Sequence, residues 1–109
     1  MLRCLISLFV TAALGALVQA RAQELADANS GREFAKGVCA ECHAVSTGQI
    51  ASPNIAAPTF RAIANSPGMS RTALIVWFQT PHPTMPNLVL KTEDLNNVIS
   101  YILSLKDQS

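Results

Sequence analysis

The stretch that most constrains this chain is Cys39-Ala40-Glu41-Cys42-His43. Two cysteines three positions apart lie on neighbouring turns of a short helical stretch, so both thiols can reach one cofactor. C-x-x-C-H is the attachment signature of a c-type haem, in which each thiol forms a thioether with one vinyl group. The histidine then lies under the ring, where its Nε2 can bind the iron. We predict one covalent haem c, attached through Cys39 and Cys42, with His43 as axial ligand.

Two other interpretations of a C-x-x-C pair fit the sequence less well. A dithiol redox pair is expected in a βαβ context, and no convincing strand is visible. A structural zinc site needs two further Cys or His residues at ligand spacing, and the sequence offers none.

Residues 1–22 are typical of a secretory signal peptide. Arg3 supplies the positive charge, and residues 5–18 are uncharged and mostly apolar. Small residues favour cleavage after Ala22, with Ala20 as the alternative. An uncleaved membrane anchor is the competing interpretation, which the length disfavours because a span takes about 20 apolar residues.

Cleavage would leave a single domain at residues 23–109 and remove Cys4, so no disulfide is expected. Cleavage would also remove Arg3 and Arg21. Six of the eight basic residues would then remain against seven acidic ones, which gives the mature chain a net charge of −1 with neutral histidines. No basic stripe for nucleic acid is present. Because this kind of haem attachment happens outside the bacterial cytoplasm, we expect a periplasmic protein without a membrane span after cleavage.

The first predicted helix runs from residue 28 or 31 to about 41. Ser30 and Glu33 have the S-x-x-E form of a capping box, with Ser30 as N-cap. Asp27 is an alternative N-cap one turn earlier. Residues 44–57 are rich in Ser, Thr, Gly, Pro and Asn, which predicts a loop.

Three more helices follow in the prediction. Thr59 caps a short one through Ala64, and Ser70 caps one at residues 71–79. Three prolines in residues 80–86 exclude a regular helix there. Thr92 caps the last helix. The apolar arc of this helix covers about half its circumference, which suggests contact with both another helix and the haem. The arc comprises Leu95, Val98, Ile99, Tyr101, Ile102, Leu103 and Leu105.

Three residues are candidates for the second axial position of the iron. Met85 lies in Pro83-Thr84-Met85-Pro86, where flanking prolines can hold a thioether in place. Met69 precedes an N-cap and is interpreted as a contact at the helix entry. His82 is interpreted as an exposed loop histidine, with a replacement ligand or a titrating group as the alternative. We predict Met85 as the ligand.

Three further residues are predicted to surround the haem. Pro58 is expected to direct a backbone carbonyl at Nδ1–H of His43, which fixes the ring, with a simple helix-start proline as the alternative. Trp77 is either core or directs its N–H at a haem propionate. Tyr101 is expected to meet Phe34 where the first and last helices cross.

With these residues placed, the chain resembles a small class I cytochrome c of the bacterial exported type. The resemblance rests on Cys39–His43, Gly31 eight residues before Cys39, Pro58, Met85-Pro86 and a last helix with Tyr101. It implies an all-α fold of three to five short helices around one haem, His/Met ligation and one-electron transfer. The chain departs from the family pattern at Ala35, where an aromatic residue is usual, with Phe34 one position earlier.

The expected function is that of a soluble exported electron carrier rather than an enzyme. Its redox partners would be an exported dehydrogenase as donor and an oxidase or reductase as acceptor, bound transiently. One alternative is a dedicated cytochrome subunit of an exported dehydrogenase or oxidase. Another is a haem enzyme or gas sensor with an open sixth position, for which His82 is the only candidate acid–base group.

Overall fold

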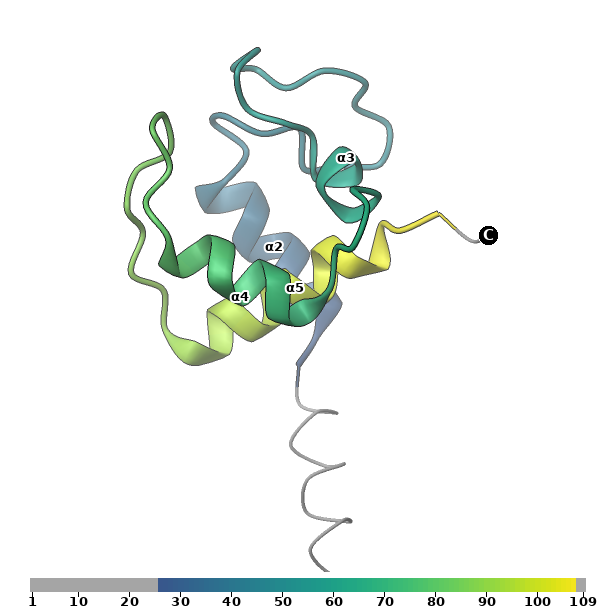
Figure 1. The fold of residues 1–109 in the computed structure, drawn as a ribbon. Coiled ribbons are helices and arrows are strands. Elements are labelled where there is room, and N and C mark those ends of the chain that lie inside the picture. The colour runs from purple at the N-terminus through teal and green to yellow at the C-terminus, as the bar shows by residue number, and fades with distance from the viewer. Residues whose placement is uncertain (1–25, 108–109) are drawn as a thin grey trace, which may run out of the picture.

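The computed structural model describes residues 26–107, and these form four helices joined by irregular segments (Figure 1). The helices are α2 (Ala28–Val38), α3 (Phe60–Ala64), α4 (Arg71–Gln79) and α5 (Thr92–Ser104). No strand occurs within the described range, so the predicted all-α class is confirmed. The predicted signal peptide and Cys4 lie outside the described residues. Within them, no helix is both long and apolar enough to cross a bilayer.

The start of α2 is set by Asp27 and not by Ser30. The carboxylate of Asp27 accepts from the backbone N–H of Asn29 at 2.9 Å and from the Ser30 hydroxyl at 2.8 Å. The backbone N–H of Asp27 in turn donates to Oδ1 of Asn97 on α5, 2.8 Å away. This contact between helices favours the earlier start, so Asp27 is the N-cap and the prediction of Ser30 is wrong.

The two short helices begin where the sequence predicts. Oγ1 of Thr59 accepts from the N–H of Ala62 at 3.0 Å, and Oγ of Ser70 accepts from that of Ala73 at 3.2 Å. Between these helices Gly68 adopts a φ of +73°, a conformation that side chains with a Cβ rarely adopt. A tight turn can therefore join α3 to α4.

Helix α5 is the element on which the others pack, since every helix pair in contact within residues 26–107 includes it. Its buried residues cover about half of the helix circumference at 3.6 residues per turn; they are Asn97, Val98, Ile99, Tyr101 and Ile102. The predicted wide apolar arc is thus used against three helices. The predicted Thr92 cap is wrong, because Lys91 is the N-cap and makes no side-chain capping bond.

The closest approach of α2 and α5 is at Gly31. A Cβ placed on Gly31 would lie 2.0 Å from the carbonyl oxygen of Asn97, so only glycine allows this approach. The aromatic ring recorded beside Tyr101 is Phe60, with 6.2 Å between centroids. Phe34 packs against the same core from a half-buried position. The first–last helix crossing therefore includes a close backbone contact at Gly31, with Phe34 packed against the core that contains Tyr101.

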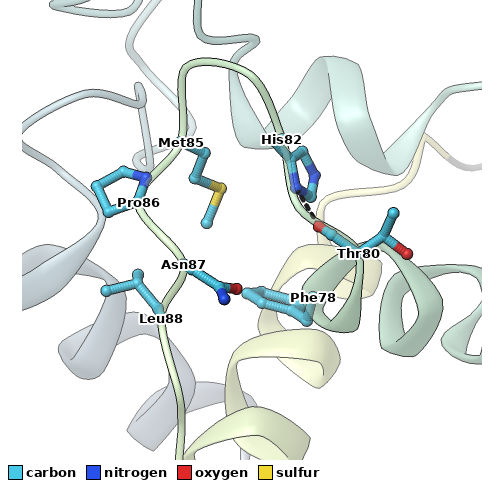
Figure 2. Close-up of a pocket in the computed structure, with 7 residues that line it drawn as sticks. All are labelled: Phe78, Thr80, His82, Met85, Pro86, Asn87 and Leu88. Atoms are coloured by element: carbon cyan, nitrogen blue, oxygen red, sulfur yellow. Dashed lines mark hydrogen bonds between the residues drawn. The ribbon is translucent and has the colours of Figure 1, made fainter.

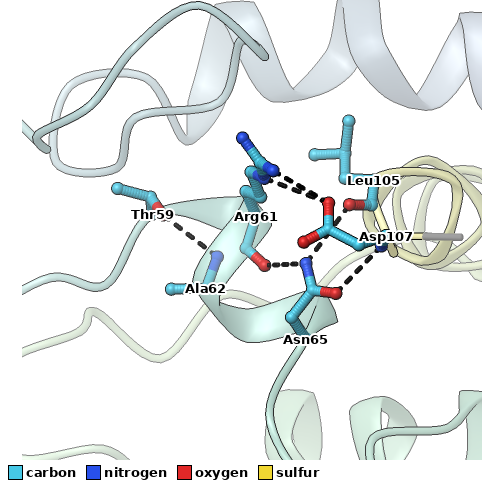
Figure 3. A network of polar contacts seen from close by, with 6 residues as sticks. All are labelled: Thr59, Arg61, Ala62, Asn65, Leu105 and Asp107. Carbon is cyan, nitrogen blue, oxygen red and sulfur yellow. Dashed lines mark hydrogen bonds and ion pairs between the residues drawn. The ribbon is translucent and has the colours of Figure 1, made fainter. Parts of the chain in front are cut away.

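Hydrogen bonds and an ion pair connect α3 to the end of α5, as Figure 3 shows. Nδ2 of Asn65 donates to the carbonyl of Arg61 at 2.8 Å and to that of Leu105 at 3.4 Å. Oδ1 of the same amide accepts from the backbone N–H of Asp107 at 2.9 Å. The guanidinium of Arg61 pairs with the carboxylate of Asp107 at 3.0 Å. The short helix that follows Pro58 is thereby held against the rest of the fold.

Candidate haem site

The Cys39–His43 stretch continues from the end of α2 as a series of tight turns. Cys39 is the C-cap, and its N–H donates to the carbonyl of Ala35 at 2.8 Å. The N–H groups of Cys42 and His43 then donate to the carbonyl of Cys39 at 3.2 and 2.9 Å. The two thiols and the imidazole are therefore placed by one compact backbone unit.

Both thiols are free, and they differ in environment. Cys39 is buried and Cys42 is half-buried. Burial raises the pKa of the Cys39 thiol to about 11, so this group is protonated at neutral pH. Dithiol redox chemistry relies on a lowered thiol pKa, which speaks against that interpretation of the motif.

The predicted contact between His43 and Pro58 is present. Nδ1 of His43 lies 2.6 Å from the carbonyl oxygen of Pro58. A carbonyl can only accept, so the proton lies on Nδ1 and the lone pair of Nε2 is left for a metal. On the same side the Phe60 ring lies 5.5 Å from the imidazole, centroid to centroid.

The loop after His43 returns to the motif through backbone bonds that the sequence did not predict. The N–H of Asn54 donates to the carbonyl of Cys42 at 3.1 Å, and that of Ala44 donates to the Ser52 hydroxyl at 3.0 Å. The Tyr101 hydroxyl donates to the carbonyl of Val45 at 2.6 Å. These bonds hold Pro58 near His43. No local pattern signals them, because their partners lie up to 56 positions apart.

Tyr101 lies in the core, 6% exposed. Burial raises its pKa above the ordinary value of 10.0, so the hydroxyl is a donor at neutral pH. Its position explains how the last helix supports the His43 side of the site, through Val45 and the Phe60 ring.

Met85 lies in a separate loop between α4 and α5. Figure 2 shows its thioether directed into a small pocket. The side chain is half-buried and does not belong to the hydrophobic core. Met69, by contrast, packs against that core beside the start of α4, as predicted for a helix-entry contact. The other residues lining the pocket are Phe78, Thr80, His82, Pro86, Asn87 and Leu88.

His82 lines the same pocket as Met85. Its Nδ1 lies 2.7 Å from the carbonyl oxygen of Thr80, and its ring lies 4.9 Å from that of Trp77. Trp77 is 54% exposed, so the interpretation of Trp77 as core is wrong. The reason is that α4 buries Leu74 against α5 and leaves the indole on the side of His82.

The donor set fits a covalent haem better than a closed zinc site. Two free thiols and an imidazole with an available Nε2 lie on one turn, and a thioether is held in a proline-flanked loop. Within residues 26–107 no three His, Cys, Asp or Glu side chains cluster in a way that could hold a metal ion. A four-ligand zinc site therefore has no second half in this part of the chain.

Comparison with known proteins agrees with this assignment. The family model described as Cytochrome c matches residues 28–106. A relative from Bradyrhizobium diazoefficiens, "Cytochrome c-552", is 38% identical over 82 residues, which cover 74% of this chain and 77% of that protein. No solved structure matches the chain.

Proposed function

Because this chain belongs to the cytochrome c family, which binds covalently attached haem c, we propose that it is an exported one-electron carrier with His43 and Met85 as axial ligands. A haem-based electron carrier is the function that family membership supports. The observation that carries the proposal is the hydrogen bond from Nδ1–H of His43 to the carbonyl of Pro58, next to two free thiols.

Each residue of the motif has a separate task in this proposal. Cys39 and Cys42 would hold the haem through thioethers, and His43 would bind the iron through Nε2. The bound haem supplies reversible one-electron chemistry. Pro58 acts as a positioning residue, because its carbonyl fixes the tautomer and the orientation of the His43 ring. Phe60 limits the tilt of that ring from one side.

Met85 is the favoured second ligand for reasons of chemistry and placement. A soft thioether suits ferrous iron, and His/Met ligation raises the reduction potential. The side chain is half-buried although it lies outside the hydrophobic core. Pro83 and Pro86 limit the freedom of the loop, so less entropy is lost when the sulfur binds.

His82 is the second candidate for the same position. Its Nδ1 faces a backbone carbonyl, as that of His43 does, so its Nε2 is also available. If His82 bound the iron, the sixth position would still be filled and the carrier function would be kept. If no residue bound it, the position would be open, and a haem enzyme or gas sensor would become the better proposal.

Substitution of the two methionines tests the ligand. Met85→Ala should abolish the weak long-wavelength sulfur–iron band of the ferric protein, lower the potential and open the sixth position to added ligands. Met69→Ala is the matched control and should keep the band. A band lost in Met69→Ala and kept in Met85→Ala would identify the other sulfur. Absence of the band in the native protein, with a spin-state change in His82→Ala, would identify histidine.

Export to the periplasm is proposed from the signal-like residues 1–22 and the family's attachment chemistry. The carrier would meet donor and acceptor proteins there in short-lived complexes, and a dedicated subunit of an oxidoreductase is the alternative. Mass spectrometry of periplasmic protein should find residues 23–109 plus one haem that stays attached in denaturant. An intact signal, or a mass without haem, would contradict the proposal.

A further inference from the structure

The middle of this chain is nearly free of charge. Between Glu41 and Lys91 the only Asp, Glu, Lys or Arg residues are Arg61 and Arg71. Arg61 is paired with Asp107 at 3.0 Å. The guanidinium of Arg71 donates to the Ser100 hydroxyl at 2.6 Å and to Oδ1 of Asn96 at 3.3 Å. Both cations are thus engaged by residues of the C-terminal part of the chain, and neither belongs to the two loops that carry the site residues.

These same loops expose large apolar side chains. Ile50 is 98% exposed and Ile55 is 100% exposed, both in the loop between His43 and Pro58. Val89, in the loop that carries Met85, is 96% exposed. None of the three contributes to the hydrophobic core, so the fold of the described residues does not explain their apolar character.

The loops are also the segments that would surround the haem. One follows directly from the Cys39–His43 turn, and the other carries Met85. In Figure 1 the loop after α2 and the loop after α4 both extend beyond the helices toward the upper part of the view. The charged residues lie mainly on α2, on the first turn of α5 and after its end.

We propose that the loops at residues 44–58 and 80–90 form an uncharged docking face for a redox partner whose own contact surface is uncharged and apolar. The inference rests on the proposed electron-carrier function and names the chemistry of its partner. A strongly acidic or basic partner surface would find no opposite charge on these loops, because they contain no Asp, Glu, Lys or Arg. An apolar partner surface would cover Ile50, Ile55 and Val89 without desolvating a charge.

Such a face has a measurable kinetic consequence. Charge pairs steer association and make its rate fall as salt screens them. Without such pairs, the rate of electron exchange should change less than about twofold between roughly 0.01 M and 0.5 M salt. The small apolar area would keep each encounter short-lived.

Electrodes coated with thiol monolayers test this directly on the haem-loaded protein. Methyl-terminated, carboxylate-terminated and amine-terminated monolayers stand for apolar, acidic and basic partner surfaces. Electron exchange should be fastest on the methyl-terminated one. Ile50→Lys and Ile55→Lys should each lower it about tenfold there, since burying an isoleucine is worth at least that factor. Asn29→Lys, an exposed position on α2, is the matched control and should leave it unchanged.

Three results of the electrode experiment would overturn the docking face. They are faster exchange on a charged monolayer, a salt effect above about tenfold, and an equal loss in Asn29→Lys. Self-association through Ile50 and Ile55, seen by sedimentation, would also overturn it, because the occupant would then be a second copy. A redox titration with small soluble mediators separates the carrier function from the docking face, because mediators need no docking surface. A reversible one-electron titration would support the carrier function even if the docking face were overturned.

Discussion

The contact between α2 and α5 at Gly31 leaves no room for a side chain. In Gly31→Ala the new Cβ would lie 2.0 Å from the carbonyl oxygen of Asn97 and 2.4 Å from its carbonyl carbon. Ordinary contacts begin near 3.4 Å, so the helices must separate by more than about 1 Å. Both facing atoms belong to the backbone, and no rotamer change can relieve the clash.

The magnitude follows from three contributions. Replacing a helical glycine by alanine gains about 0.5–1 kcal/mol of stability. Overpacking in a close-packed contact costs about 1–3 kcal/mol. Separation of the helices also strains the hydrogen bond from Asp27 to Asn97, 2.8 Å long, which is worth about 1 kcal/mol. The free energy of unfolding should therefore fall by about 1–3 kcal/mol, a large share of the 5–15 kcal/mol that is usual.

Gly37→Ala is the matched control, because Gly37 lies on the same helix and a Cβ there meets no atom within 4 Å. This variant should gain about 0.5–1 kcal/mol. Guanidinium unfolding of the haem-loaded protein, followed by far-ultraviolet circular dichroism, measures both. Equal midpoints for the two variants would refute the proposed backbone contact.

Two further predictions concern long-range bonds of the fold. Tyr101→Phe should cost about 1–2 kcal/mol, because the carbonyl of Val45 loses its donor. Burial raises the pKa of Tyr101 in the folded protein, so the phenol of the unfolded chain ionises first as pH rises past 10.0. The native protein should therefore lose stability above that pH. Urea unfolding midpoints should show a smaller loss in Tyr101→Phe, which has no phenol to ionise at this position. Asn65→Ala should lower the unfolding temperature by removing the amide bonds of Figure 3. Asn65→Asp, which keeps the acceptor for the N–H of Asp107, should lie between Asn65→Ala and the native protein, and equality of all three would contradict this role.

Elements with a local cause were predicted correctly from the sequence. Thr59 and Ser70 cap α3 and α4 through bonds to residues three positions ahead, which is a local pattern. The three prolines of residues 80–86 exclude a helix for an equally local reason. The His43–Pro58 contact was found because a ligand histidine needs a partner for Nδ1, a chemical requirement and not a matter of fold.

Errors occurred where tertiary contacts decide between local alternatives. Ser30 and Asp27 are both good N-caps, and the bond from Asp27 to Asn97 on another helix selects Asp27. Helix α5 begins after Lys91 without a side-chain cap, because packing against the other helices stabilises it. For Trp77 the sequence leaves two alternatives open, core or a haem propionate, and the pairing of α4 with α5 leaves the indole half exposed.

The two histidines differ in what orients their rings. Both direct Nδ1 at a backbone carbonyl, at 2.6 Å for His43 and 2.7 Å for His82. For His82 that carbonyl lies two residues away, so a local turn suffices to orient the ring. For His43 it lies fifteen residues away and is in place only when the intervening loop is folded. That loop depends on the Ser52 hydroxyl and on the N–H of Asn54, which bond to the backbone of the motif. Orientation of His43 is therefore linked to the stability of the loop, whereas the orientation of His82 is not.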